Sequence, residues 1–283
     1  MRLKRTMPRL VLFTDLDGTL LDHDTYSFEP AREALASLES ENIPVVFTTS
    51  KTRAEIEKWR RLTGNLHPFI SENGGGIFVP EGYFGGSFAH DTKEGGYLVI
   101  ELGAPHAELA GALADIRQAT GIDIRGVSEM EVEEIMQLTG LDEGAAALVK
   151  QREYGEPFVV YGDGEAEETV IREIEKRGYS HTQGGRFHHI LGGSDKGKAV
   201  SILKGLYVKE WGVVVTAGIG DSLNDIPMLK AVDIPILVRK PGGGYDERVK
   251  LAGMAIADAP GPYGWNSAVL KLIVSFGEKE PEE

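Results

Sequence analysis

Two aspartates stand two residues apart where an apolar run near the start of the sequence ends. The run "LVLFT" (10–14) leads into Asp15 and Asp17, and Gly18 follows. Two carboxylates this close repel each other and are costly to take out of water. A divalent cation would offset that cost, and a carboxylate beside such a cation can attack phosphorus. The pair therefore predicts phosphoryl chemistry rather than a plain solvated turn.

Further polar side chains stand beside three other predicted elements. They are Thr49 and Ser50 at the end of the run 43–50, Lys196 at a helix start, and Asp221, Asn224 and Asp225 in "GDSLND" (220–225). Hydroxyl and ammonium groups suit phosphoryl oxygens. Mg²⁺ prefers hard oxygen ligands. Four aspartates offer such oxygens: Asp15, Asp17, Asp221 and Asp225.

These side chains can meet only if a parallel sheet brings the ends of its strands together. Apolar runs alternate with helical patterns, and they are found at 9–14, 43–50, 213–219 and 234–238. Such alternation predicts an α/β fold with a Rossmann-like parallel sheet that helices cover on both faces. Ligands bind outside the carboxyl ends of strands in this class, so one crevice collects all four segments.

The alternation of strands and helices stops in the middle of the chain. Between 83 and 190, predicted helices at 105–119, 129–138 and 142–151 cluster between strands, as in an α+β unit. We therefore expect a catalytic core formed by 1–82 and 191–283, interrupted by an inserted α+β domain at 83–190.

Bulk composition excludes several classes of protein. The 283 residues carry a formal charge of −14, which argues against binding to nucleic acid or an anionic membrane. No apolar stretch approaches the roughly 18 residues of a membrane span. The chain has no cysteine, so a metal must take oxygen or histidine ligands, and this composition fits a reducing cytoplasm. Oligomeric state is left open.

The four segments resemble, in order and spacing, the four motifs of the haloacid dehalogenase superfamily of phosphotransferases. These motifs are "DLDGT", a Ser/Thr after the second strand, a lysine at a helix start, and "GDSLND". The resemblance implies that Asp15 is the nucleophile and that Asp17 is the general acid/base, which offers the metal its backbone carbonyl. It also implies that Ser50 and Lys196, with Thr49 beside them, bind phosphate. Asp221 and Asp225 would hold Mg²⁺.

Longer strings resemble one phosphatase family within that superfamily. "TTSKTRAE", "FISENGGGIFVPEGYF", "QREYGEPF" and "GGRFHHILGGSDKGKA" are similar to the mannosyl-3-phosphoglycerate phosphatases. The resemblance implies Mg²⁺-dependent release of phosphate from mannosyl-3-phosphoglycerate, which gives the compatible solute mannosylglycerate. It leaves open whether the sugar is mannosyl or glucosyl, and whether Lys196 or Lys198 meets the phosphate.

A substrate with a phosphate, a carboxylate and a hexose needs cations and polar groups around it. The candidate substrate-binding residues are Lys51, Glu72, Asn73, Arg152, Arg186, His188 and Asn224. His188 and His189 are neighbours on one predicted strand, so at most one of them faces the site.

Two other functions are compatible with the same motifs. A sugar phosphomutase would pass the phosphoryl group to another hydroxyl, and an acid/base at position 17 serves that reaction equally well. A regulatory protein would bind the sugar phosphate without turnover. Release of free phosphate distinguishes the phosphatase from both.

Overall fold

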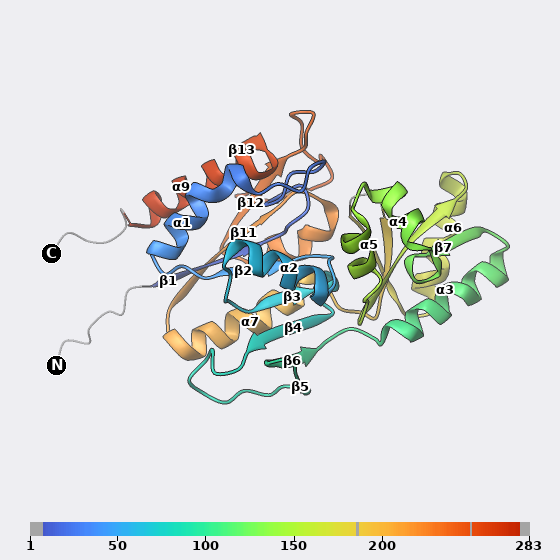
Figure 1. The fold of residues 1–283 in the computed structure, drawn as a ribbon, viewed down its shortest axis with the longest axis horizontal. Helices are drawn as coiled ribbons and strands as arrows, with labels where there is room; N and C mark the ends of the chain where they lie inside the picture. The colour runs from blue at the N-terminus through green and yellow to red at the C-terminus, as the bar shows by residue number, and fades with distance from the viewer. Residues whose placement is uncertain (1–7, 185–186, 250, 278–283) are drawn as a thin grey trace.

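The structure is a computed structural model that describes residues 8–184, 187–249 and 251–277. Within these ranges, a nine-stranded sheet runs through the larger part of the molecule in the order β13-β12-β11-β1-β2-β3-β4-β6-β5 (Figure 1). Neighbouring strands from β13 to β3 are parallel, and the last three strands pair antiparallel. The parallel strands are β1 (Arg9–Thr14), β2 (Val45–Thr48), β3 (Phe69–Ser71), β11 (Val214–Gly220), β12 (Ile234–Arg239) and β13 (Ala255–Pro260). The predicted α/β fold is confirmed.

The central strand β1 is apolar because both of its faces are covered. Leu10 and Leu12 point into one hydrophobic cluster, while Val11 and Phe13 point into the other. The first cluster packs under α1 (Arg32–Ser40), α2 (Arg53–Thr63) and α9 (Gly261–Gly277). The second packs under α7 (Lys196–Trp211) and α8 (Ile226–Ala231). Helices on both faces leave the strand ends as the place where polar side chains can gather.

The chain between β6 and α7 forms a smaller unit around a second, antiparallel sheet of order β7-β8-β10-β9 (Figure 1). Its strands are β7 (Asp123–Gly126), β8 (Gly155–Tyr161), β9 (Ser180–Gly184) and β10 (Phe187–Leu191). Side chains of α3 (His106–Thr120) and α6 (Gly164–Lys176) pack in one hydrophobic cluster. Those of α4 (Val132–Thr139) and α5 (Glu143–Val149) pack in another.

The smaller unit begins later than residue 83, where we expected the insert to start. Strands β4 (Gly76–Pro80), β6 (Tyr97–Glu101) and β5 (Thr92–Glu94) extend the large sheet. The ring of Tyr97 packs edge-on against Phe69 and Phe78 of that sheet. This aromatic packing holds β6 in the large sheet, and the chain leaves that sheet only after Glu101.

The two ends of the described chain lie together, away from the polar strand ends. Arg9 at the start of β1 and Gly277 at the end of α9 line one groove, and the ribbon places the start of β1 and the end of α9 on the side away from the smaller unit (Figure 1). In the part of the chain that the structure describes, no helix is long and apolar enough to cross a membrane.

Candidate active site

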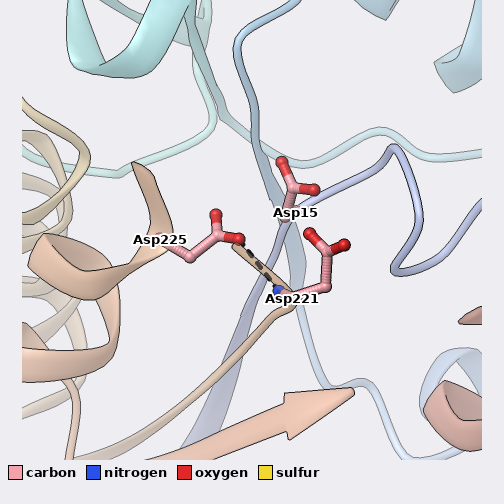
Figure 2. Close-up of side chains that lie close together, drawn as sticks. All are labelled: Asp15, Asp221 and Asp225. Carbon is pink, nitrogen blue, oxygen red and sulfur yellow. Dashed lines mark hydrogen bonds between the residues drawn. The ribbon is translucent and has the colours of Figure 1, made fainter. Parts of the chain in front are cut away.

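Three aspartates converge where β1 and β11 end. Because β1 and β11 are adjacent parallel strands, Asp15 and Asp221 emerge side by side, and the backbone N–H of Asp15 donates to Ile219 O at 2.9 Å. Asp225 reaches the same point from the short 3₁₀ turn Leu223–Asp225. One carboxylate oxygen of each lies within 4.8 Å of the others (Figure 2). Two of the four segments that were predicted to converge, the first and the last, thus meet at this point.

Lys196 is the ammonium group of this cluster. Its side chain is fully buried, and Nζ lies 2.7 Å from Asp15 Oδ1 and 2.6 Å from Asp225 Oδ1. Burial alone would lower the pKa of Lys196, but the two carboxylates outweigh it and raise that pKa. Lys198 is exposed and donates to the carbonyl of Gly193 instead. Of the two lysines, Lys196 is therefore the one beside the aspartates.

Asp225 has a second contact that fixes the loop around it. Its Oδ2 accepts the backbone N–H of Asp221 at 2.9 Å (Figure 2). The same oxygen accepts the backbone N–H of Ser222 at 3.0 Å. Asp221 in turn accepts from Ser222 Oγ at 2.8 Å and from Lys240 Nζ at 2.6 Å. These contacts set the direction in which the carboxylate of Asp221 points.

The electrostatics of the cluster favour a bound cation. Burial raises the pKa of Asp15, and the nearby Asp225 and Asp221 carboxylates add to the shift although Lys196 opposes it. Burial likewise raises the pKa of Asp221. A divalent ion would bring positive charge to this point and favour the ionised carboxylates. With their hard oxygens and this spacing, the residues present fit Mg²⁺.

Asp17 lies on the next turn and has a different partner. Its Oδ2 lies 2.9 Å from Lys51 Nζ, and Lys51 also contacts Glu55 Oε1 at 3.3 Å. Glu55 is held by the capping box at the start of α2. Burial lowers the pKa of Lys51, but Asp17 and Glu55 more than compensate and raise it. The other oxygen of Asp17, Oδ1, is buried without a hydrogen bond among the residues that the structure describes.

A cavity opens over the aspartates, with one wall from each unit. From the larger part of the molecule, Ser50, Lys51, Asn224 and Lys240 line it beside Asp15, Asp17 and Asp221. From the smaller unit, Arg152 and His189 line it together with an apolar set: Leu141, Val149, Pro157 and Phe187. A ligand in this cavity would touch both units at once.

Several predicted substrate residues lie outside the lining of this cavity. Thr49 is buried, and its hydroxyl accepts from Lys51 N at 3.4 Å. Asn73 Oδ1 accepts from Asn224 Nδ2 at 3.1 Å, and Glu72 is fully buried among backbone N–H groups. These side chains satisfy protein groups instead of facing the cavity. Arg186 lies outside the described residues.

The structure places His189, and not the predicted His188, in the lining of the cavity. His188 stacks on Phe158 with ring centroids 5.5 Å apart, and its Nδ1 lies 2.9 Å from His181 Nε2. His189 lines the cavity. Successive side chains on a strand alternate between its two faces. Which of the two histidines faces the cavity therefore depends on which face of β10 carries α4 and α5.

Sequence reasoning also missed Lys240, Tyr26 and the apolar wall of the cavity, which is formed by Leu141, Val149, Pro157 and Phe187. Lys240 directly follows β12, so the rule that selected Asp15 and Ser50 applies to it as well. Tyr26 donates from its hydroxyl to Thr139 O of the smaller unit at 3.3 Å. The apolar wall gave no signal, because Leu141 and Val149 are equally expected as core residues of short helices.

Comparison with known proteins gives consistent matches. Residues 12–83 match the model of a family described as haloacid dehalogenase-like hydrolase. A glucosyl-3-phosphoglycerate/mannosyl-3-phosphoglycerate phosphatase of Methanococcoides burtonii is 48% identical over 93% of this chain and 97% of its own length. A mannosyl-3-phosphoglycerate phosphatase of Pyrococcus horikoshii is 37% identical over 81% of this chain and 90% of its own. A solved sugar phosphatase of the same superfamily, subclass IIB, shares the fold with a TM-score of 0.63 at 20% identity, covering 94% of this chain and 98% of its own.

Proposed function

This chain belongs to the haloacid dehalogenase-like hydrolases and is a phosphoric monoester hydrolase acting on a sugar phosphate, and on that premise we propose its substrate. The substrate is mannosyl-3-phosphoglycerate, which the enzyme hydrolyses to mannosylglycerate and phosphate. Glucosyl-3-phosphoglycerate is a second substrate of the same cavity, as the double name of the Methanococcoides burtonii relative suggests. The observation that carries the proposal is the buried Asp15–Lys196–Asp225 cluster beneath a cavity with walls from both units.

Asp15 and Asp17 divide the chemistry between them. A carboxylate oxygen of Asp15 forms a bond to phosphorus while the bond to the glycerate oxygen breaks, and Asp17 gives that leaving oxygen a proton. Asp17 then takes a proton from water, whose oxygen bonds to phosphorus as the bond to Asp15 breaks. Lys196 favours the ionised form of the attacking carboxylate and orients it. The smaller unit acts as a cap that excludes bulk water from the intermediate.

Asp15, Asp221 and Asp225, with the backbone carbonyl of Asp17, would hold Mg²⁺. When bound, this ion neutralises charge on the transferring phosphoryl group. Among the Asp, Glu, Lys and Arg side chains that line the cavity, four carboxylates face three cations. The net charge of these side chains is therefore negative and would repel a phosphorylated carboxylic acid. A bound divalent cation would make the net charge positive.

The rest of the cavity matches the remainder of the substrate. Lys51 and Lys240 provide positive charge for an anion. The apolar wall of Leu141, Val149, Pro157 and Phe187 offers a surface for the hydrophobic face of a hexose. A phosphorylated glycerate that carries a hexose uses both regions, whereas 3-phosphoglycerate alone uses only the first.

A panel of phosphate esters tests this function. Phosphate release is measured for mannosyl-3-phosphoglycerate, glucosyl-3-phosphoglycerate, 3-phosphoglycerate and mannose 6-phosphate, with Mg²⁺ and with EDTA. We expect the two hexosyl esters to exceed the others in kcat/KM by about a hundredfold, since contacts worth ~3 kcal/mol to the hexose are lost without it. Equal rates for 3-phosphoglycerate would overturn the substrate assignment.

The variant Asp15→Asn tests the mechanism on the same panel. An amide at this position cannot form the acyl phosphate, so we expect turnover to fall by at least about a thousandfold. The exposed Asp24→Asn variant serves as the matched control and should retain full activity. Near-normal hydrolysis by Asp15→Asn would rule out Asp15 as the nucleophile.

A further inference from the structure

A buried ion pair lies beside the cavity and has no part in the chemistry described so far. The side chains of Glu72 and Arg152 are 0% and 2% exposed, and Arg152 Nε lies 3.1 Å from Glu72 Oε2. Glu72 Oε1 accepts Glu153 N at 2.8 Å, and Oε2 accepts Tyr154 N at 3.1 Å and Gly155 N at 2.9 Å. Buried charges persist only with such full pairing. The pair is therefore a built structural contact.

The two partners belong to different units. Glu72 is in the turn that follows β3 of the large sheet, whereas Arg152 is in the link between α5 and β8 of the smaller unit. Tyr154 of the same link lies in the hydrophobic cluster of the large sheet. A Cβ at Gly75 would lie 2.3 Å from Tyr154 Cβ, and one at Gly76 would lie 2.7 Å from its ring. The glycines of "ENGGGIF" thus allow this link to dock.

The turn that carries Glu72 has an unfavourable backbone conformation. Glu72 and Asn73 have φ values of 48° and 56°, in the left-handed region. Such strain persists only where surrounding contacts determine the conformation, and it often marks functional positions. Here the contacts of Glu72 with the link, and of Asn73 with Asn224, supply that constraint.

Three successive carbonyls beside the phosphate-binding position are held by this turn and by Arg152. Thr49 O accepts from Asn73 N at 2.9 Å, and Lys51 O accepts from Glu72 N at 3.0 Å. Ser50 O, between them, accepts from Arg152 Nη2 at 3.1 Å. These hydrogen bonds fix the backbone of residues 49–51, and the side chains of Ser50 and Lys51 line the cavity.

From these contacts we infer that Arg152 and Glu72 are positioning residues that hold Ser50 and Lys51 in place for the phosphoryl group. They act through the backbone of residues 49–51 and not by contact with the sugar, which differs from the substrate contact expected from sequence. The inference rests on the proposed function only for the role of Ser50 in binding phosphate. Because Arg152 comes from the smaller unit, the phosphate site is complete only when that unit is docked.

The variant Arg152→Met removes the contact while keeping an apolar stem of similar length. Its kcat/KM is measured on mannosyl-3-phosphoglycerate and on p-nitrophenyl phosphate, which is too small to reach the apolar wall. A positioning role lowers both values by a similar factor, about ten- to a hundredfold, because both substrates use Ser50. A loss confined to the sugar substrate would show direct contact with the sugar and overturn the inference.

Glu72→Gln gives an independent test, because Glu72 does not line the cavity and cannot touch substrate. We expect it to impair both substrates equally and to do so less than Arg152→Met. Arg125→Met is the matched control, since Arg125 pairs with Glu134 at a half-buried position of the same unit, away from the cavity lining. It should leave both rates unchanged.

Binding of inorganic phosphate separates this inference from the substrate assignment. Calorimetric titration of Mg²⁺-loaded protein with phosphate should show weaker binding for Arg152→Met and for the milder Arg152→Lys. In a Ser50→Ala background the further effect of Arg152→Lys should largely disappear, because both changes act on one contact. Additive effects, or unchanged phosphate affinity in folded Arg152→Lys and Glu72→Gln proteins, would overturn it. Failure of the wild type on the hexosyl esters would instead contradict the proposed substrate.

Discussion

At the scale of single residues, the two aspartates of the first motif are distinguished by the lysines that pair with them. Asp15 shares the fully buried Lys196 with Asp225, whereas Asp17 shares Lys51 with Glu55. Lys51 is itself held by a helix cap, which anchors Asp17 to α2. Two carboxylates of identical chemistry are thereby given different surroundings, as their proposed roles of nucleophile and proton carrier require.

Lys240 has a testable effect at the same scale. Its Nζ lies 2.6 Å from Asp221 Oδ2, so it competes with a metal ion for that oxygen and also brings positive charge to the cavity. In Lys240→Met we expect the half-saturating Mg²⁺ concentration to fall and the KM for substrate to rise, each by roughly three- to tenfold. Steady-state kinetics over a grid of Mg²⁺ and substrate concentrations measures both values.

The exposed Lys230→Met variant removes one lysine from α8 and controls for a general change in charge. If the half-saturating Mg²⁺ concentration and the KM for substrate both rose or both fell in Lys240→Met, the assigned position of Lys240 between metal and substrate would be contradicted.

At the scale of elements, the glycines after β3 are required by packing. Gly75 has the right-handed values φ −65° and ψ −39°, which any residue can adopt. Its substitution is therefore opposed by packing, chiefly by Tyr154, whose Cβ would lie 2.3 Å from a new Cβ, while the carbonyl oxygen of Glu72 would lie 3.3 Å away. We expect Gly75→Ala to lower the free energy of unfolding by about 1–3 kcal/mol, as overpacking does. Urea denaturation followed by circular dichroism measures the change.

Gly111 provides the opposite case for the same chemical change. It is an exposed position inside α3, and a Cβ there would meet no atom within 4 Å. Gly111→Ala should raise the free energy of unfolding by roughly 0.5–1 kcal/mol, because alanine is the better helix former. If both substitutions stabilised the protein equally, the docking of Tyr154 on Gly75 would be wrong.

Local sequence signals were sufficient for the strands and motifs of the core. Apolar runs located β1, β2 and β11, and the rule of strand ends then located Asp15, Ser50 and Asp221. The same signals failed for β7 and β9, because "DIRG" and "SHTQG" are polar and are strands only through pairing with β8 and β10. The roles of Glu72 and Arg152 depend on a contact between residues 80 positions apart in the chain. Periodicity and propensity carry no information about such a contact.

At the scale of the whole molecule, burial at the junction of the two units makes stability depend on pH. Glu153 contacts Arg53 at 3.1 Å, and its side chain is 27% exposed. Burial raises the pKa of Glu153 from 4.5 to about 7; the Arg53 charge opposes this shift, and Glu72, Glu94 and Glu101 add to it. The folded state therefore binds more protons than the unfolded state between these two pH values.

Stability should accordingly fall as pH rises through this window. The contribution of the protonated carboxyl is fully present below pH 4.5 and is lost above pH 7. Glu153→Gln cannot ionise, so we expect wild type to lose about 1–2 kcal/mol relative to the variant between pH 5 and pH 8, after allowance for solvent screening. Chemical denaturation of both proteins across this range measures the difference. If the free energy of unfolding changed with pH in the same way in both proteins, a raised pKa of Glu153 would be contradicted.

The groove that Arg9 and Gly277 share has a practical consequence for handling the protein. The start of β1 and the end of α9 lie on the side of the molecule away from the smaller unit, which forms one wall of the cavity, so a tether joined to the chain before β1 or after α9 would leave the cavity open to solution. A peptide that joins the chain after α9 to the chain before β1 would also allow new ends to be cut in an exposed loop, such as the one around Gly86. Immobilised or circularly permuted forms should therefore keep the catalytic surface accessible.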